Sequence, residues 1–431
     1  MWFGLNIYFD SDMSKLSVVM SNRKNVLLLG ASGAMSAAFL HHLRSVRDTF
    51  GDLVLLDKRI LPKDPFIIRS HYSDFIQMNV TRRTIGKFVE VINSKKIDVV
   101  IDLSNADTDL VSEAIFGLEN VSYIGSSFSN REPLGRVMPP WMTKIRKMTH
   151  KVPHILNTGM NSGVVNIWAA YGIRKYGRPK GIVEFEYDST NFREKIRSDI
   201  VTWNIEDFLE GLIADPAALA VGRNIFVEKK HKAMSKTYPL RTYLQHFVKL
   251  DRYPRGAMVA HEECITLAGK YDVPVRYLYA LHPAVMRYLK GLLKKRSVCI
   301  SALELVRNSE NNLTGADSIG MQLEYEDKYV YYFNSVKNES MQCCTATAYQ
   351  VIVGIYAAFF SILDSKIKAG VYLPEDLLDT IYSRFVFHNL PTIEKVILKS
   401  GKVEKRKRVQ PTHAVEDVFD LGTRVSSGMH S

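Results

Sequence analysis

Residues 25–43 read NVLLLGASGAMSAAFLHHL, and this stretch decides the fold of the amino-terminal part of the chain. It opens with an apolar run, Val26–Leu29, that predicts a buried strand. Gly30-Ala31-Ser32-Gly33 ends the run, and Ala34–Leu43 favours a helix. A strand, a glycine turn and a helix in this order direct backbone N–H groups and the positive end of a helix at one place, which suits a pyrophosphate.

The glycine turn departs from the strict G-x-G-x-x-G pattern, because Ser32 and Met35 stand at two of the glycine positions. A second apolar strand, Leu53–Leu56, ends at Asp57, whose carboxylate is placed to bind an adenosine ribose. An ordinary turn with a solvated aspartate is the alternative interpretation. The candidate cofactor-binding residues of this region are Gly30, Ser32, Gly33, Ala34 and Asp57.

Apolar strands alternate with helical stretches up to about residue 129, which predicts a parallel sheet covered by helices on both faces. Such sheets bind ligands beyond the carboxyl ends of their strands. Ser104 and Asn105 follow the strand Asp98–Asp102 at that end, so they are further candidate cofactor contacts, although they equally suit the cap of the next helix. The other expected elements are a strand at 121–124 and helices at 81–94 and 108–118.

The pattern breaks at Pro133–Trp141, which we interpret as a crossover to a second domain. A turn rich in glycine and asparagine follows at 154–163, before a helix that begins near Val164. Later strands alternate with helices but lack another glycine turn, which predicts an α+β domain. The expected strands are 181–187, 226–228, 257–261 and 325–333, and the expected helices are 205–212, 283–294, 345–361 and 374–387.

The sequence therefore predicts an α/β protein with a Rossmann-type, doubly wound parallel sheet at its amino-terminus and a second, α+β catalytic domain inserted before carboxy-terminal helices. The expected boundaries are 22–140 for the first domain, 141–340 for the second, 341–398 for helices that return to the first, and 399–431 for a polar basic tail. Residues 1–20 look like an extension, in which Met13 or Met20 is an alternative start.

Composition excludes several classes of protein. The 431 residues are 46% hydrophobic and 24% charged, as in ordinary globular proteins. The net charge of +12 invites a nucleic-acid function, but its one dense run, Lys405–Arg408, lies in the expected tail without a nucleic-acid-binding motif. No apolar run has the length that spans a bilayer, and no signal peptide precedes the first strand, so we expect a cytoplasmic protein that does not enter a membrane.

The four cysteines favour a reducing compartment. They include no C-x-x-C pair, and the adjacent Cys343 and Cys344 have a spacing at which disulfides are rare. The stretch His261-Glu262-Glu263-Cys264-Ile265 begins like a zinc-protease helix, but Ile265 stands where the second histidine belongs. We therefore expect no metal site.

Four places in the second half combine residues that suit a cationic substrate. Carboxylates neutralise ammonium groups, and the face of an indole attracts a cation. Taken alone, each residue also has an ordinary interpretation as a core tryptophan, a solvated glutamate or a hydrogen-bonded histidine. The four places are Thr202-Trp203-Asn204 before an acidic helix start, Glu184 and Glu186 on one face of a strand, His261-Glu262-Glu263 at a strand end, and Gly315-Ala316-Asp317 in a turn.

The chain resembles bacterial homospermidine synthase, a member of the saccharopine dehydrogenase-like group. Six segments carry the resemblance in the family's order, and together with the glycine turn they cover about residues 25–390. They are GMNSGVV at 159–165, where Ser162 replaces the family's proline; Thr202-Trp203 with the acidic stretch after it; AHEE at 260–263; YLYALHP at 277–283; GADSIG at 315–320; and CTATAYQVIVG at 344–354.

This resemblance implies a tightly held NAD and a reaction that forms a polyamine, and we expect a homodimer. An amine such as putrescine is oxidised by NAD to an imine, the imine loses ammonia, a second amine condenses, and the returned hydride reduces the new Schiff base. The implied catalytic residues are Trp203, which holds cationic intermediates; Asn161 and Glu186, which bind amines; His261 and Glu263, which transfer protons; and Asp317, which anchors the distal ammonium.

Two departures from the family bear on substrate and cofactor. The family's acidic segment after the strand near Tyr123 is replaced by Gly125-Ser126-Ser127-Phe128, with Glu132-Pro133 only later, which leaves the identity of the amines open. Lys58-Arg59 follows Asp57 and would also suit a 2′-phosphate, so NADP stays an alternative to NAD.

Two other functions remain open. A saccharopine-type reductase would join an amine to an oxo acid and would need an arginine clamp for carboxylates, for which Arg276 is the candidate. A regulator that binds a dinucleotide without turnover is the alternative from a different class.

Overall fold

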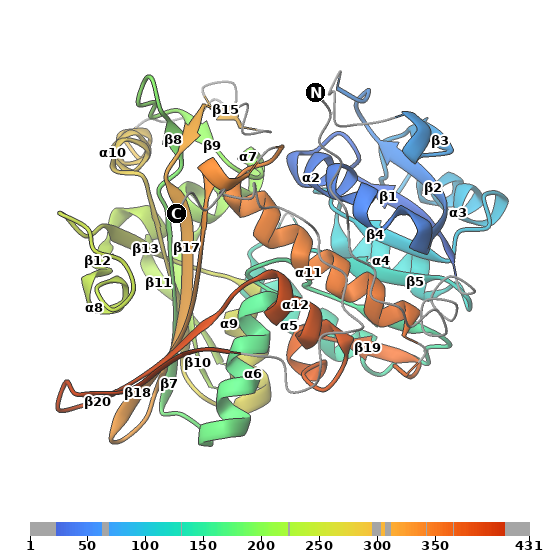
Figure 1. The fold of residues 1–431 in the computed structure, drawn as a ribbon. Coiled ribbons are helices and arrows are strands. Elements are labelled where there is room, and N and C mark those ends of the chain that lie inside the picture. The colour runs from blue at the N-terminus through green and yellow to red at the C-terminus, as the bar shows by residue number, and fades with distance from the viewer. Residues whose placement is uncertain are drawn as a thin grey trace, which may run out of the picture.

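The structure is a computed structural model that describes residues 23–62, 69–130, 132–222, 225–294, 303–306, 312–341, 343–364 and 366–409. The expected extension at 1–20 and the last 22 residues of the expected tail (410–431) lie outside these residues. Two β-sheets occupy the two sides of the described structure, and a long helix, α11 (Ala346–Leu363), runs between them (Figure 1).

The first sheet has seven strands, all parallel, in the order β19-β6-β5-β4-β1-β2-β3. This is the doubly wound order of a Rossmann-type sheet, extended at one edge by β19. Its strands are β1 (Lys24–Leu29), β2 (Phe50–Asp57), β3 (Asp74–Gln77), β4 (Val99–Asp102), β5 (Ser122–Gly125), β6 (Pro153–Ile155) and β19 (Gly370–Tyr372). Its helices are α2 (Ala34–His42), α3 (Ile85–Ser94), α4 (Thr108–Phe116) and α5 (Leu134–Ile145).

The second sheet is mixed and has ten strands, with the main path β11-β10-β14-β7-β17-β18-β20-β21 and with β13 joining β12 to β14. The strands are β7 (Gly181–Asp188), β10 (Pro216–Gly222), β11 (Ile225–Lys232), β12 (Thr237–Pro239), β13 (Arg255–Val259), β14 (Val275–Leu281), β17 (Ala316–Glu324), β18 (Lys328–Lys337), β20 (Ile393–Leu398) and β21 (Val403–Arg408). Two short pairs join β8 (Asn191–Phe192) to β16 (Leu313–Thr314) and β9 (Ile200–Val201) to β15 (Glu304–Leu305). The predicted fold class is confirmed.

Several helices follow β6 in the sequence. They are α6 (Val164–Tyr176), α7 (Ile205–Leu209), α8 (Arg241–Leu244), α9 (Glu262–Tyr271), α10 (Pro283–Leu292), α11 and α12 (Ile381–Asn389), with a π-type turn at Glu210–Ala214. Single 3-10 turns lie at Leu43–Ser45, Arg47–Thr49, Arg69–His71, Ala233–Ser235, Asn338–Ser340 and Pro374–Asp376.

Helix α11 packs against the first sheet although it follows most of the second sheet in sequence. Phe359 stacks on Phe50 at the start of β2, and Tyr356 Oη donates to the carbonyl of Phe39 in α2 at 2.7 Å. Within the described residues, α11 is the one helix long and apolar enough to cross a membrane, but 94% of it is buried inside the fold. Its apolar composition is therefore explained by its place in the core.

Two stretches differ locally from the expected pattern. Residues 133–141 are mostly helical, since Met138, Trp141, Met142 and Ile145 bury one face of α5 in spite of Pro139 and Pro140. Residues 374–387 form a 3-10 turn and then a separate helix, because Thr380 caps α12.

The basic run Lys405–Arg408 is not a loose tail but belongs to β21, which pairs with β20. Lys405 reaches the buried Glu394 at 3.1 Å, and this ion pair ties the strand to the sheet. The expected domain boundaries at 140 and 340 stay predictions.

Candidate active site

The glycine turn of residues 30–33 forms a backbone cradle at the carboxyl end of β1. Gly30 has φ +85°, and a Cβ on it would lie 2.7 Å from the backbone of Leu103, so the turn requires glycine there. Gly33 is the N-cap of α2 and Ala34 its first residue, and no side chain of the described residues caps the helix. The N–H groups at this helix start therefore present positive charge to the space beside the turn.

Asp57 lies at the end of β2 beside this cradle. Its buried carboxylate accepts hydrogen bonds from the backbone N–H of Ser32 at 2.9 Å and from that of Arg59 at 2.8 Å. Each oxygen keeps a second acceptor position for a ribose hydroxyl. Ser32 itself is only 2% exposed. The residues present therefore fit a dinucleotide.

The end of β2 carries groups that suit both NAD and NADP. The Arg59 guanidinium lies 3.8 Å from the Asp57 carboxylate and is 56% exposed. A carboxylate favours the free 2′-hydroxyl of NAD, whereas a guanidinium favours a 2′-phosphate. Both groups are present at the same position.

Ser104 and Asn105 follow β4 at the same edge of the sheet. Ser104 donates to Asp102 from its N–H at 2.9 Å and from its Oγ at 2.7 Å. The Asn105 amide donates to the carboxylate of Glu206 in α7, a residue of the second half. This bond joins the strand ends of the first sheet to the segment that follows Trp203. Contact of Ser104 and Asn105 with a cofactor stays a prediction.

Five buried carboxyl groups gather on one face of the second sheet, and we call them the acidic cluster. Three come from alternate positions of β7, which places them on the same face. The fourth is the cross-strand neighbour of Asp188 on β17, and the fifth lies in the first turn of α9. The members are Glu184, Glu186, Asp188, Asp317 and Glu263, all at most 4% exposed.

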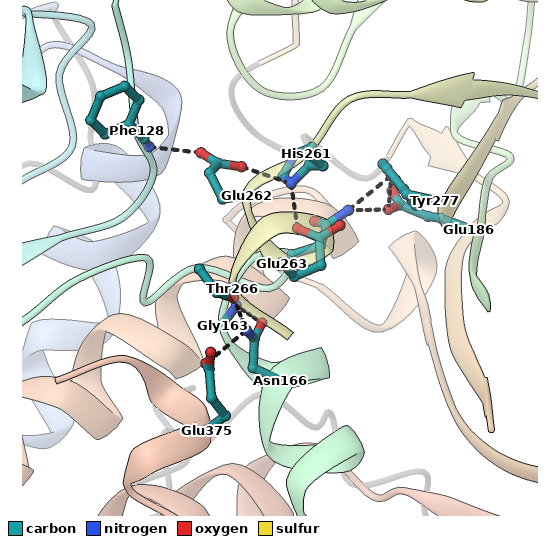
Figure 2. Close-up of polar contacts among 11 residues, drawn as sticks. Phe128, Gly163, Asn166, Glu186, His261, Glu262, Glu263, Thr266, Tyr277 and Glu375 are labelled. Atoms are coloured by element: carbon teal, nitrogen blue, oxygen red, sulfur yellow. Dashed lines mark hydrogen bonds and ion pairs between the residues drawn. The ribbon is translucent and has the colours of Figure 1, made fainter. Parts of the chain in front are cut away.

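Glu186 is the best-connected member of the cluster. Its Oε2 accepts from Asn161 Nδ2 at 2.8 Å and from Tyr277 Oη at 2.5 Å, and Asn161 also bonds Tyr277 at 2.8 Å (Figure 2). Burial outweighs these hydrogen bonds and raises the pKa of Glu186 to about 7. This carboxyl group therefore changes its protonation in the physiological range.

Two carboxyl groups of the acidic cluster are poorly compensated by hydrogen bonds or by opposite charge. Both oxygens of Glu184 and Oδ1 of Asp317 make no hydrogen bond within the described residues. Burial, followed by the charge of neighbouring carboxylates, raises the pKa of both groups well above the usual range. No lysine or arginine of the described residues forms an ion pair with the cluster, which has His261 as its ion-pair partner. An added cation would relieve this arrangement.

His261 links the cluster to the first sheet. Its Nδ1 lies 2.6 Å from Glu263 and 2.8 Å from Glu262, and Glu262 accepts from the backbone N–H of Phe128 at 2.7 Å (Figure 2). Burial opposes the charged imidazole, but the charges of Glu263 and Glu262 raise the pKa of His261 well above its ordinary value. The ligand atoms of this trio lie within 4.8 Å of one another, yet the imidazole already bonds both carboxylates. The absence of a metal here stays a prediction.

The glycine-rich loop at 159–163 is held so that Asn161 faces the cluster. Gly163 has φ +142°, and a Cβ on it would lie 1.8 Å from the carbonyl oxygen of Gly159. Asn166 accepts from the Gly163 N–H at 2.9 Å and donates to the buried Glu375 at 2.8 Å (Figure 2). The loop is therefore more than a plain connector, because its shape sets the position of Asn161.

Trp203 lies at the edge of the same face. Its indole N–H donates to Tyr279 Oη at 3.4 Å, and the preceding Thr202 donates to Asp188 at 2.8 Å. The side chain of Asn204 caps α7 by accepting hydrogen bonds from the N–H groups of Glu206 and Asp207. This cap fixes the turn that carries the indole. The side chain of Trp203 is half-buried, so part of it is open to solvent.

The structure brings together all six predicted catalytic residues, but Asp317 lies in a different element from the one expected. This residue was expected in a turn, and it lies instead in β17, whose pairing with both β7 and β18 overrides the glycine signal of Gly315. The prediction from sequence missed Asp188 and the two tyrosines at 277 and 279. Their signal was the period-two spacing of acidic and aromatic residues in β7 and β14, which pair in parallel.

Arg276, the candidate carboxylate clamp, lies away from the cluster. It alternates with Tyr277 along β14, so its side chain points to the opposite face of the sheet. There its guanidinium donates to Tyr243 Oη of α8 at 3.3 Å.

Comparison with known proteins shows the fold. No protein-family model matches the chain, and no curated protein matches its sequence. The structure is similar to the crystal structure of homospermidine synthase from Legionella pneumophila in complex with NAD, with a TM-score of 0.67 and 15% identity over 91% of this chain and 94% of that chain. An amine dehydrogenase from Mycobacterium smegmatis aligns at a TM-score of 0.39 and 9% identity over 82% of this chain and 95% of its own, too weakly to carry an argument. The chain thus shares its fold with this homospermidine synthase, which was crystallised in complex with NAD.

Proposed function

We propose that the protein is an NAD-dependent enzyme of the homospermidine synthase type, which oxidises a diamine such as putrescine, condenses the product with a second amine and reduces the new imine to a polyamine with loss of ammonia. The acidic cluster carries this proposal. It buries five carboxyl groups beside a tryptophan without a lysine or arginine partner in the described residues, and diamines carry the matching charge.

The cofactor site and the amine site have separate roles. NAD, when bound on the cradle with its ribose at Asp57, supplies the hydride acceptor and donor. Glu186 and Asp317 bind ammonium groups of the amine, and Asn161 orients the Glu186 carboxylate through its hydrogen bond. The indole of Trp203 stabilises iminium intermediates, which carry their charge next to the reacting carbon.

Proton transfer falls to the His261–Glu263 pair. An ammonium group must lose a proton before its carbon can give up a hydride, and condensation requires proton transfer to and from nitrogen. The imidazole of His261 is held between Glu262 and Glu263, so it can exchange protons with a carboxylate that adjoins Glu184. The contact between Glu262 and Phe128 supports this pair from the side of the first sheet.

Other functions have less support. A reductase for an oxo acid needs a cation at the substrate carboxylate, and Arg276 lies on the opposite face of the sheet. A dinucleotide-binding regulator explains the cradle but gives no reason to bury uncompensated carboxyl groups. The homodimer, the cytoplasmic location and the absence of nucleic-acid binding stay predictions.

Product analysis distinguishes these functions. The purified protein is incubated with NAD and putrescine, and the products are identified by mass spectrometry. Homospermidine and ammonia are expected. Formation of product only with an oxo acid and NADH or NADPH would support the reductase, and a bound nucleotide without turnover would support the regulator. Either outcome would refute the proposal.

The role of Trp203 has its own test. Trp203→Ala is expected to lower turnover about 10- to 30-fold, because loss of a desolvated cation–π contact costs up to about 2 kcal/mol. Trp203→Phe keeps an aromatic face and should restore part of the rate. NAD affinity, measured by fluorescence titration, should stay within about twofold in both variants. Equal turnover of the alanine variant and the wild type would exclude the cation-holding role.

A further inference from the structure

A second group of chemically active side chains lies outside the acidic cluster, where α2 meets the start of α11. His41 and His42 end α2, and Cys343 and Cys344 precede Thr345, the N-cap of α11. His42 Nε2 lies 3.9 Å from Cys343 Sγ and 4.0 Å from Cys344 Sγ. The ligand atoms of His41, His42 and Cys343 all lie within 4.8 Å of one another. Three nitrogen and sulfur donors, from His41, His42 and Cys343, therefore converge from distant parts of the sequence, and Cys344 adjoins them through its contact with His42.

The spacing of these donors is close to that of a metal centre. Zinc binds sulfur at about 2.3 Å and imidazole nitrogen at about 2.0–2.1 Å, so a tetrahedral site places sulfur and nitrogen about 3.6 Å apart. The two distances from His42 Nε2 to the sulfur atoms exceed this value by only a few tenths of an ångström. The group contains no carboxylate, and thiolate with imidazole selects zinc over magnesium or calcium.

Burial and charge also favour a metal ion at this group. Cys343, Cys344 and His42 are at most 4% exposed, and His41 is half-buried. Two thiolates and one divalent cation sum to zero charge, so a metal would make this buried group neutral.

We propose that His41, His42, Cys343 and Cys344 bind a zinc ion at the junction of α2 and α11. All four positions are then taken by protein, which is the arrangement of a structural site and not of a catalytic one. The ion would fix the carboxyl end of the helix whose other end carries the glycine cradle. The Phe39–Tyr356 stack, at 4.5 Å, already joins the same two helices, and the metal would lock their register.

Metal content and cobalt substitution test the proposal on the whole protein. After removal of any affinity tag and dialysis, elemental analysis is expected to find about one zinc per chain. Exchange with Co²⁺ should produce thiolate-to-cobalt charge-transfer bands and the intense visible bands of tetrahedral cobalt. Less than about a tenth of a zinc per chain together with no such bands after Co²⁺ addition would overturn the proposal.

Variants locate the ion. Cys343→Ala and His42→Gln should each weaken Co²⁺ affinity by roughly two orders of magnitude or more, since even an outer-shell change costs about 10- to 100-fold. Cys264→Ala removes another buried thiol and should retain the metal, which makes it the matched control. Full binding by the Cys343 and His42 variants, or a Cys343–Cys344 disulfide in protein kept under reducing conditions, would refute the site. If a variant fails to fold, the cobalt spectrum of the wild type still decides.

Discussion

The cradle and the acidic cluster differ in how the chain builds them. The cradle is contiguous: Gly30 through Ala34 lie at the end of one strand and the start of one helix, and their backbone angles define the site. The cluster is assembled from β7, β17 and α9, whose carboxyl groups are separated by up to 133 residues, and its shape depends on strand register. A contiguous site is fixed by local conformation, whereas an assembled site is fixed by the pairing of distant strands.

The largest expected effect is on turnover. It separates the catalytic role of the acidic cluster from its contribution to the stability of the fold. Glu186→Gln should lower turnover about 10²- to 10⁴-fold, the range of a lost acid–base or charge-binding group. The free energy of unfolding without substrate should stay equal or rise, because a buried ionisable group becomes a neutral amide. Steady-state kinetics and urea unfolding measure the two quantities. Glu324→Gln, on the same sheet but partly exposed, is the control, and unchanged turnover in Glu186→Gln would remove this residue from the mechanism.

The cradle should respond in the opposite way. Gly30→Ala forces a Cβ against the backbone of Leu103 at positive φ, a strain of about 1–3 kcal/mol that should weaken NAD binding roughly 10- to 100-fold. Gly86→Ala lies in α3 with open space around it and should bind NAD normally while gaining about 0.5–1 kcal/mol in stability. Calorimetric titration with NAD measures both variants. Equal affinity of the Gly30 variant and the wild type would exclude the cradle as the cofactor site.

A pH dependence is expected of the acidic cluster. The pKa of Glu186 is raised from its ordinary 4.5 to about 7, so folding favours the protonated form. Its contribution to stability is full below pH 4.5 and is lost as the pH rises through 7. Diamine binding favours the ionised form and should strengthen over the same window, by at most about tenfold per pH unit. Melting temperatures with and without putrescine from pH 5 to 8 measure both trends, and a flat profile would contradict the shift.

The smallest expected effect concerns Arg276, on the face of the second sheet opposite the acidic cluster. Arg276→Gln removes a hydrogen bond to Tyr243 but no contact with the cluster, so turnover with diamines should stay within about twofold. A loss of activity with an oxo acid in the same variant would instead favour the reductase. The kinetic comparison of both substrate classes decides between them.

The sequence predicted what depends on neighbours in the chain. The cradle, Asp57 and the run of parallel strands followed from apolar periods and glycine, and Asn161 and Trp203 from the resemblance. The strand position of Asp317 did not, because Gly315 signals a turn and only the pairing with β7 shows otherwise. Helix α5 was missed because Pro139-Pro140 suggests a break, while its buried face decides in favour of a helix.

Contacts between distant segments could not be predicted from the sequence. The basic residues of β21 look solvated until the strand pairs with β20 and Lys405 meets Glu394. The approach of His42 to Cys343 has no spacing pattern, since His42 ends α2 and Cys343 lies just before α11, two segments that meet only in the folded protein. The pairing of Tyr277 with Glu184 and of Tyr279 with Glu186 likewise appears only once β14 and β7 are in register.

The edge strand β19 has a consequence for how the protein is made. It pairs with β6 at residues 153–155, yet it is synthesised only at residues 370–372, after the whole second sheet apart from β20 and β21. A ribosome therefore releases β1 to β6 long before the strand that completes their sheet and before α11, whose Phe359 covers Phe50. During that interval the nascent chain exposes an unpaired β6 edge and an uncovered aromatic surface, the features that chaperones bind and that promote aggregation. The carboxy-terminal segment thus sets the time at which the amino-terminal domain can finish folding.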